Sequence, residues 1–442
     1  MKTVVAGLGP TGRMLASFLQ KEKHDLILID QKIEAVQHAR ERFDAQIECG
    51  DTCDPTVLEP IIDDTVDFFI ALTPDDKTNI ISTLIARKFG VKRAIVRIGD
   101  PNNFIHPLLT EDPNVSMLNA EMIVSKELMH LVSTPAADEV EFFAKGKAEI
   151  ARFHIPKGAP ILGNKLCETV MPPTWIVAAL IRKGHFVIAS GDTILEAEDE
   201  ILVVGNPKRH GEVESILGLK SPNVKRVVVV GYNSITSKLV RALTKRGVEV
   251  RIIEETKEMA EKAAATLDKA LVFQGDATDE AILDQAGISE TDYLIALTDD
   301  DETNVLVSLL AKEKRVPHVA TITQKTQYNR VIQKIGIDTS INPRAAMVNE
   351  LVRVMHRGDL LDINILEGGQ GRMIEFEVHK KTKLIGKELS KIKLPKQILI
   401  GAIVRGEELI IPRGKTKLQI NDHVVVFTTM SIVSEVKKLF GH

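Results

Sequence analysis

An internal repeat is the feature that most constrains how this chain can fold. Asp67 begins the segment DFFIALTPDDKTNIISTLIARKFGVKRA, and Asp292, 225 residues later, begins the matching segment DYLIALTDDDETNVLVSLLAKEKRVPHV. Three pairs of glycines keep nearly the same spacing, namely Gly50 with Gly275, Gly7 with Gly231, and Gly163 with Gly386. A shift that stays this constant over both halves predicts two copies of one architecture.

Each copy changes character part-way along. Residues 1–135 alternate short β-branched runs with amphipathic segments of helix length, which is typical of a doubly wound parallel sheet. Residues 136–220 contain short strand-like runs between glycine-rich and acidic turns, which predicts a small α+β module rich in antiparallel strands. We name these modules N1 and C1, and their repeats N2 (residues 221–358) and C2 (residues 359–442). The predicted fold class is therefore α/β, with two Rossmann-like domains alternating with two small α+β domains.

Composition narrows the class of protein further. The 442 residues are 44% hydrophobic and 27% charged, which suits several globular cores. The 57 basic and 61 acidic residues leave a net charge of −4, which disfavours a nucleic-acid binder. Every apolar run is shorter than the roughly 20 residues that span a bilayer, so we expect a soluble chain. Three cysteines and an amino terminus without a signal-peptide pattern indicate a reducing, cytoplasmic compartment.

A glycine-rich turn is the strongest local motif. The run Gly7-Leu8-Gly9-Pro10-Thr11-Gly12 follows a strand expected at residues 3–6 and precedes a helix expected from Arg13 to Gln20. In that setting GxGxxG indicates a phosphate-binding turn: the first glycine allows the tight turn, the second lets backbone approach a pyrophosphate, and the third allows close packing. Pro10 lacks an N–H, which a helix start tolerates. We predict an open mouth beside Gly9 and include Pro10, Thr11 and Arg13 among the cofactor-binding residues.

Further polar residues stand at the ends of the following strands of N1. Asp30 ends the strand LILID, where a carboxylate can accept both ribose hydroxyls of an adenosine and would repel a 2′-phosphate. We therefore expect NAD or NADH, or ATP or ADP, rather than NADP. Asp51, Thr52 and Thr73 come at the same sheet edge and are expected to flank the adenine and the ribose, while Arg97 can neutralise phosphates. The alternatives are a carboxylate that caps a strand and an ordinary surface arginine.

The corresponding turn of N2 is degraded. Asn233 and Thr236 replace the second and third glycines after Gly231, and Ser234 follows. Asn233 can adopt a left-handed conformation, but its side chain intrudes on the phosphate path. Glu254 keeps the ribose carboxylate. We predict that this second site binds adenosine nucleotides more weakly or prefers a different one.

Catalytic groups are missing from the sequence pattern. A dehydrogenase needs a proton donor or acceptor beside the nicotinamide, and no His, Lys or Arg constellation recurs between the copies. We therefore predict no catalytic residues, and no metal site, because the Cys49 and Cys53 pair is absent from the second copy. An NAD-dependent cytosolic oxidoreductase remains the alternative.

Two helices after the parallel sheets have the spacing of a buried contact face. We predict contact between modules there, with coverage of each helix's own sheet as the alternative. The residues are Met122, Ile123, Leu128, Met129 and Val132 in the first copy, and Met347, Val348, Leu351, Val352 and Met355 in the second.

A family resemblance rests on four features taken together. They are the tandem plan, the GxGxxG turn with Asp30, the IALT motifs at residues 70–73 and 295–298, and the match of Asn79 with Asn304. The chain resembles the peripheral nucleotide-binding subunits of Trk potassium-uptake systems, which are built from two RCK (regulator of potassium conductance) units. The resemblance places the nucleotide positions of that family on seven residues of N1 and four of N2: Gly7, Gly9, Gly12, Asp30, Asp51, Thr73 and Arg97, and Gly231, Glu254, Asp276 and Thr298.

The resemblance implies a cytoplasmic homotetrameric ring that docks on a membrane potassium transporter and gates it, because a nucleotide has unequal affinity for two arrangements of the ring. It also implies ligand and assembly roles for C1 and C2. A regulatory subunit of another cation transporter is the alternative, and the sequence leaves open the preferred nucleotide and the direction of its effect.

Overall fold

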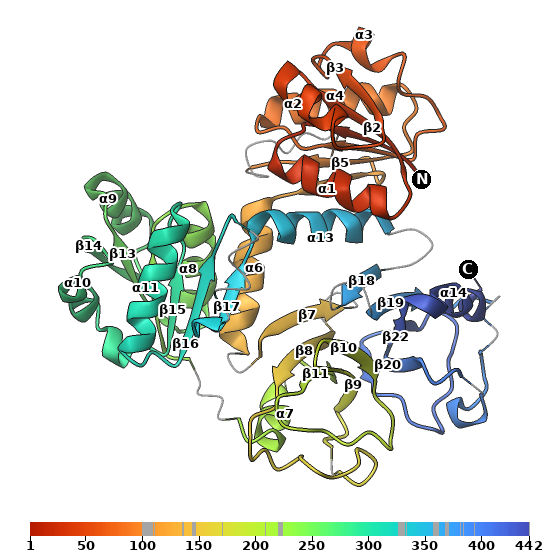
Figure 1. The fold of residues 1–442 in the computed structure, drawn as a ribbon, viewed down its shortest axis with the longest axis vertical. Helices are drawn as coiled ribbons and strands as arrows, with labels where there is room; N and C mark the ends of the chain where they lie inside the picture. Colours follow the sequence, from red (N-terminus) through yellow and green to blue (C-terminus); the bar gives the residue numbers. More distant parts are fainter. Residues whose placement is uncertain are drawn as a thin grey trace.

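The computed structural model describes residues 1–442 except 100–108, 110, 135–136, 144–146, 170, 208, 220–223, 326–331, 333, 357–361, 367–370, 381, 383, 393 and 442. Four sheets are present in the described part, one in each predicted module (Figure 1). The domain boundaries expected at residues 135/136, 220/221 and 358/359 lie outside the described residues and stay predictions.

N1 is a six-stranded parallel sheet with the strand order β3-β2-β1-β4-β5-β6. Its elements are β1 (Lys2–Ala6), α1 (Pro10–Lys21), β2 (Asp25–Asp30), α2 (Ile33–Arg40), β3 (Gln46–Cys49), α3 (Pro55–Leu58), β4 (Phe68–Ala71), α4 (Asp76–Lys88), β5 (Arg93–Arg97), β6 (Val115–Leu118) and α6 (Ala120–Ser133). The strands are apolar on both faces because helices cover both faces of the sheet. The strand order reverses between β1 and β4, which is where sheets of this kind form a ligand crevice.

N2 repeats this topology with the strand order β14-β13-β12-β15-β16-β17. Its elements are β12 (Arg226–Val230), α8 (Ser234–Lys245), β13 (Glu249–Glu254), α9 (Lys257–Thr266), β14 (Ala270–Gln274), α10 (Glu280–Gln285), the 3-10 turn η3 (Ile288–Glu290), β15 (Tyr293–Ala296), α11 (Asp301–Glu313), β16 (His318–Ile322), β17 (Thr339–Ile341) and α13 (Pro343–His356).

C1 and C2 are five-stranded sheets whose neighbouring strands run antiparallel, as predicted. C1 contains β7 (Glu139–Phe143), β8 (Ala148–His154), β9 (Trp175–Arg182), β10 (His185–Ile188), β11 (Glu200–Gly205) and α7 (His210–Ile216). C2 contains β18 (Asp362–Leu366), β19 (Gly371–Glu377), η6 (Leu389–Lys391), β20 (Ile398–Arg405), β21 (Glu408–Ile410), β22 (His423–Thr429), η7 (Met430–Ile432) and α14 (Val433–Phe440).

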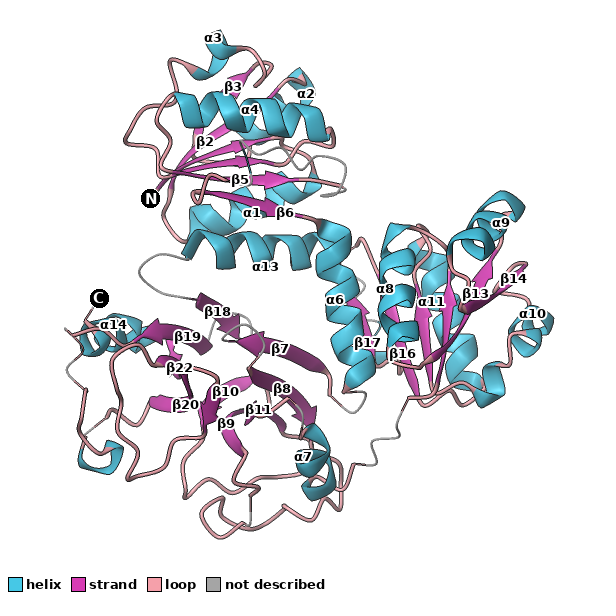
Figure 2. Cartoon of the chain, turned by 180° about the vertical axis from the view of Figure 1, so that it is seen from behind, coloured by secondary structure: helices cyan, strands magenta, loops and turns pink. Residues whose placement is uncertain are grey.

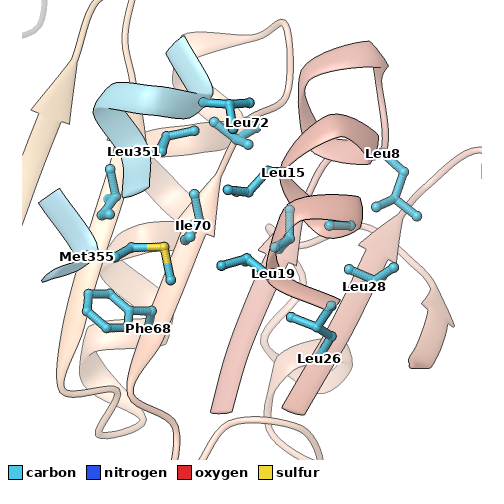
Figure 3. Close-up of a cluster of buried hydrophobic side chains, with 14 of the residues drawn as sticks. Leu8, Leu15, Leu19, Leu26, Leu28, Phe68, Ile70, Leu72, Leu351 and Met355 are labelled. Atoms are coloured by element: carbon cyan, nitrogen blue, oxygen red, sulfur yellow. The ribbon is translucent and has the colours of Figure 1, made fainter. Parts of the chain in front are cut away.

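The two N-type modules exchange their last helices. α13 belongs to N2 in sequence but packs on α1 and the N1 sheet, and α6 belongs to N1 but packs on α8 and the N2 sheet (Figures 1 and 2). All five predicted residues of α13 lie in the N1 core, and Figure 3 shows two of them, Leu351 and Met355. Leu128, Met129 and Val132 of α6 lie in the N2 core. The predicted contact between modules is therefore confirmed, and coverage of each helix's own sheet is wrong as the main role.

One residue of the predicted contact face does not belong to it. Met122 lies in the first turn of α6 and is 51% exposed. Ile123 packs at the edge of the N1 core instead. The exchanged α13 is also held at its carboxyl end, where Arg93 donates to the carbonyl oxygens of Val354 (2.8 Å) and Met355 (3.2 Å).

A buried acidic residue makes the junction between α6 and C1 sensitive to pH. Glu149 on β8 is fully buried, and burial together with the nearby Glu214 carboxylate raises the pKa of Glu149 to about 8. The unfolded chain ionises Glu149 near its ordinary pKa, so the folded state binds the extra proton and loses stability as the pH rises from about 4.5 toward 8.

We expect Glu149→Gln to remove this loss, because glutamine resembles the protonated acid. The variant should gain roughly 2–4 kcal/mol over the parent at pH 8.5 and little at pH 5. Thermal unfolding across this pH range measures the difference. An equal gain at both pH values would contradict the assignment.

Candidate nucleotide-binding site

The turn after β1 has the backbone that the glycine pattern predicts. Gly7 has φ +98°, and a Cβ there would lie 2.8 Å from the backbone nitrogen of Thr73, so only glycine fits. A Cβ on Gly12 would lie 2.0 Å from the Gly7 carbonyl oxygen, so the absence of a side chain at Gly12 lets α1 pack closely beneath the turn. A Cβ on Gly9 would meet nothing within 4 Å. Gly9 therefore faces open space, where a ligand can approach the backbone.

The helix after the turn begins earlier than predicted. α1 starts at Pro10 rather than Arg13, with Gly9 as its N-cap residue. Proline suits this position, since its missing N–H has no partner within a helix anyway. No side chain caps the helix, and its first turn carries no acidic residue. The remaining N–H groups and the positive end of the helix dipole are thus available to an anion.

A cavity of about 450 Å³ opens at this point, along the edge where β1, β2 and β4 end. It is lined by ten of the eleven N1 residues predicted to bind the cofactor, and Gly12 is the exception because it lies beneath the turn. The ten are Gly7, Gly9, Pro10, Thr11, Arg13, Asp30, Asp51, Thr52, Thr73 and Arg97. Asp51 and Thr52 follow β3 by two and three residues rather than ending it. The mouth beside Gly9 is open, as predicted.

Asp30 is fixed by the backbone in an orientation suited to a ribose. Its Oδ2 accepts the N–H of Leu8 at 2.7 Å, and its Oδ1 accepts the N–H of Lys32 at 2.9 Å. An ionised carboxylate has about four acceptor positions, so two remain for hydroxyl donors. Asp30 also lines the cavity, which places these two acceptor positions within reach of a ligand there.

Three cations line the same cavity. Arg13 is oriented by a hydrogen bond from Nη1 to the Leu8 carbonyl oxygen at 2.7 Å. Arg97 and Lys32 also line it. Arg97 thus lies where it can reach a bound phosphate, and its role there stays a prediction. Together with the open end of α1, these groups fit the phosphates of a nucleotide.

A buried asparagine connects two of the lining residues. The Asn79 side chain is fully buried, and its Oδ1 accepts from the N–H (2.9 Å) and hydroxyl (2.7 Å) of Thr73. Its Nδ2 donates to the carbonyl oxygens of Thr73 (2.9 Å) and Arg97 (3.0 Å). Asn304 makes the same four bonds in N2, to Thr298 and Ile322. The asparagine thus ties together the ends of two neighbouring strands in each copy.

The second turn is closed by its own side chain. The Asn233 Oδ1 accepts the N–H groups of Ile235 (3.0 Å) and Thr236 (3.1 Å), and its Nδ2 donates to the Leu297 carbonyl oxygen at 2.7 Å. Asn233 is extended, with φ −143°, and does not use the left-handed conformation open to it. Its carboxamide therefore occupies the end of α8 where a phosphate would bind. Ser234 is the first residue of that helix.

Other features of the second turn keep the pattern of the first. Gly231 has φ +90°, and Glu254 accepts the N–H groups of Tyr232 (2.7 Å) and Thr256 (2.9 Å), as Asp30 accepts two backbone N–H groups in N1.

The other strand ends of N2 differ in charge from those of N1. Asp276 accepts hydrogen bonds from the N–H and hydroxyl of Thr278, which lowers the pKa of Asp276. Ile322 takes the place of Arg97, so N2 lacks that cation.

Comparison with known proteins decides the family. The TrkA-N domain matches residues 3–125 and 227–343, and the TrkA-C domain matches residues 150–218 and 373–441. The chain belongs to the TrkA family. A relative from Methanosarcina mazei, named Trk system potassium uptake protein TrkA homolog 1, is 32% identical over the whole of both chains. Trk system potassium uptake protein TrkA of Vibrio alginolyticus is 30% identical over 100% of this chain and 98% of its own.

Solved structures support the fold of this TrkA family member. The GsuK RCK domain is 17% identical, covers 99% of this chain and 94% of its own, and has a TM-score of 0.62. The GsuK channel bound to NAD is 18% identical, covers 99% of this chain and 78% of its own, and also has a TM-score of 0.62. Identities this low show the RCK-type fold alone.

Several residues that line the cavity were not among those predicted from the sequence. Lys32 follows Asp30 by two residues and was detectable as the only cation in that loop. Asp75 and Thr78 also line the cavity; hydrogen bonds from Thr78 lower the pKa of Asp75, which caps α4. Within the described residues, every helix is too short or too polar to cross a bilayer, and no cluster of metal-ligating side chains forms.

The two buried asparagines provide a matched prediction. We expect Asn79→Ala and Asn304→Ala to cost similar stability, about 2–4 kcal/mol each, since each leaves buried hydrogen-bonding groups without a partner. Only Asn79→Ala should also weaken nucleotide binding, by about tenfold, because Thr73 and Arg97 line the cavity. Calorimetry with NADH and with ATP measures this. Equal loss of affinity in both variants would contradict the placement of the site in N1.

Proposed function

We propose that this TrkA family member is the nucleotide-binding regulatory subunit of a membrane potassium transporter, peripheral on its cytoplasmic face. The observation that carries the proposal is the open, uncapped end of α1 beside Asp30 and three cations. Full-length relatives are named as potassium uptake proteins, which supports the choice of partner. We also propose the four module boundaries stated from the sequence.

The ligand we propose is NAD or NADH, or ATP or ADP, held as an effector rather than as a substrate. Asp30 would hold the ribose, and the α1 backbone with Arg13 and Arg97 would hold the phosphates. Solved GsuK structures are described as bound to NAD and to ADP, which is consistent with this ligand class. Asp51, Thr52 and Thr73 would flank the adenosine. The N2 residues Gly231, Asn233, Ser234, Glu254, Asp276 and Thr298 form at most a weak second site.

The exchanged helices provide a route from the site to the rest of the chain. α1 begins at the cavity, and its Leu15 and Leu19 pack in the same core as Leu351 and Met355 of α13 (Figure 3). Because α13 continues from N2, a small movement of α1 changes how N1 and N2 sit against each other. A ligand shifts this arrangement only if it binds one form more tightly, and a tenfold preference per site is worth about 1.4 kcal/mol.

We further propose that the chain assembles into a homotetrameric ring. Ile81 on α4 and Leu306 on α11 occupy equivalent positions in the repeat and are 45% and 47% exposed. The same outward apolar position on the same helix of both copies suits contact between chains.

Replacing both residues by aspartate should reduce a tetramer to monomers or dimers, as measured by light scattering after size-exclusion chromatography. Ile33→Asp is the control, because Ile33 is equally exposed at 46% but is matched by Lys257 in the repeat. An unchanged tetramer in the Ile81→Asp, Leu306→Asp protein would contradict this interface.

The function is tested by reconstitution. The tagged chain should co-purify with a membrane potassium transporter, and potassium flux through that complex should change when NADH or ATP is added. Co-purification with a transporter of another cation would show that the proposed partner is wrong and would identify the actual one. Conversion of NADH during the assay would favour an oxidoreductase and overturn the proposal.

A further inference from the structure

Five exposed cations gather on one surface of C2. The segment that contains η6 lies beside the segment of residues 413–417, because the N–H of Leu389 donates to the Thr416 carbonyl oxygen at 3.0 Å and the N–H of Ser390 donates to that of Gly414 at 2.8 Å. These two segments form a short ladder at the surface of the module. Its exposed cations, which we call the basic face, are Lys387, Lys391, Arg413, Lys415 and Lys417.

The basic face keeps most of its charge. Residues 387–391 and 413–417 contain a single carboxylate, Glu388, which pairs with Lys391 at 3.0 Å. The other four cations of the face make no ion pair within the described part of the chain. Their charges are therefore available to a partner outside the chain.

C1 has the same ladder without the cations. Its equivalent backbone bonds run from Leu166 to Thr193 and from Cys167 to Gly191, and each is 2.9 Å long. The residues at the five positions of the basic face are Asn164, Glu168, Ser190, Asp192 and Ile194, of which two are acidic and none is basic. The backbone of the ladder therefore forms without these cations, and their role has to lie elsewhere.

The excess of positive charge extends over C2 and contrasts with the rest of the chain. Residues 371–442 contain 14 Lys and Arg against 7 Asp and Glu, whereas the corresponding residues 148–219 of C1 contain 7 against 9. The whole chain nevertheless has a net charge of −4, so its other modules are acidic. A chain polarised in this way turns C2 toward a negatively charged surface and its other modules away from it.

We propose that the basic face docks on the anionic lipid headgroups of the membrane surface. Four of its five cations are lysines, whose hydrated ammonium groups on flexible stems suit a fluid layer of charge, whereas arginine is the usual partner of one fixed carboxylate or phosphate. Residues 384–396 and 411–419 contain no aromatic side chain on which a nucleic-acid base could stack. The choice of a membrane rests on the proposed function, which places the chain at that surface.

Docking on lipid gives the chain an attachment separate from its contact with the transporter. The potential of an anionic leaflet falls off within about 10 Å at 0.1 M salt, so only cations on the face that meets the membrane contribute. Each of these cations strengthens the partition into the membrane by about fivefold. The lipid composition of the membrane would then be an input to the chain that does not depend on the nucleotide at N1.

Co-sedimentation of the full chain with lipid vesicles tests this proposal. We expect binding to vesicles of phosphatidylcholine that contain about one-third phosphatidylglycerol, and no binding to phosphatidylcholine alone. The triple variant Lys387→Gln, Lys415→Gln, Lys417→Gln should lower the partition coefficient by roughly a hundredfold, which is the product of three fivefold contributions. Raising the salt from about 0.1 M to about 0.5 M should release the parent chain.

A matched control removes the same charge elsewhere. Lys157, Lys183 and Lys262 are exposed lysines outside C2 that make no ion pair within the described residues. The triple variant Lys157→Gln, Lys183→Gln, Lys262→Gln should lower the partition coefficient by less than about threefold, because salt screens charges that do not meet the membrane.

The remaining outcomes overturn the proposal. An equal loss in the two triple variants would show that net charge, rather than the basic face, attracts the chain. Equal binding to both kinds of vesicle would indicate apolar adsorption, and a change of oligomeric state in the first triple variant would place a second copy of the chain on the face. NADH binding, measured in parallel, should be the same in both variants. A chain that binds NADH but not the anionic vesicles would refute the docking surface and leave the proposed function standing.

Discussion

Gly9→Asn should abolish nucleotide binding at N1, with a loss of affinity of 100-fold or more. Asn233 provides the physical reason, because it occupies the same position in N2 and its carboxamide accepts the N–H groups of the following helix at 3.0 and 3.1 Å. A phosphate would have to displace those bonds and would lose its backbone donors. Losing charge-assisted hydrogen bonds at a helix end costs roughly 3 kcal/mol, which corresponds to the expected factor.

The reciprocal change tests the same geometry in N2. Asn233→Gly should uncover the end of α8 and raise the affinity of the second site, although Ile322 still leaves it without the Arg97 cation. Calorimetry with NADH and ATP on both variants gives the two affinities. Tighter binding by the Gly9→Asn protein than by the Asn233→Gly protein would overturn the account of both turns.

The second large effect concerns the exchanged helices. Leu351 of α13 is fully buried in the N1 core beside Leu15 and Leu19. Leu351→Ala should therefore destabilise the contact between N1 and N2 by about 2–5 kcal/mol, the range for a buried leucine. Met122→Ala on α6 is the control and should change stability by less than about 0.5 kcal/mol, since Met122 is 51% exposed.

Hydrogen exchange is the suitable measurement, because a chain of several modules does not unfold in a single step. We expect Leu351→Ala to speed amide exchange both in α13 and in the N1 helix α1. Faster exchange confined to N2 would mean that α13 belongs energetically to its own sheet, contrary to the packing.

The N1 site was largely predictable because its signals are local. Gly7 must have a positive φ, and Asp30 must end the neighbouring strand, so a strand–turn–helix pattern places both residues at one sheet edge. Lys32 was missed because a lysine two residues after a strand usually points to solvent. Gly12 was counted among the cofactor-binding residues because it belongs to the glycine pattern, but it packs beneath the turn and does not line the cavity.

The helix exchange was only half predictable. The apolar spacing of α6 and α13 indicates a buried face but carries no information about which sheet covers it. Met122 fits that spacing and is nevertheless 51% exposed, so the spacing alone does not separate the residues that pack from those that do not. Likewise, the composition of the second turn indicated weaker binding, but the self-capping by Asn233 depends on its side-chain conformation, which a sequence pattern does not specify.

Equilibrium dialysis of the intact chain against NADH, and separately against ATP, tests the central claim most directly. We predict one tightly bound nucleotide per chain, lost in Gly9→Asn, and its recovery from the dialysate chemically unchanged. We claim that N1 binds a nucleotide as an effector and leaves it chemically unchanged. This claim would be contradicted by two equivalent sites per chain, by binding that survives Gly9→Asn, or by conversion of the nucleotide.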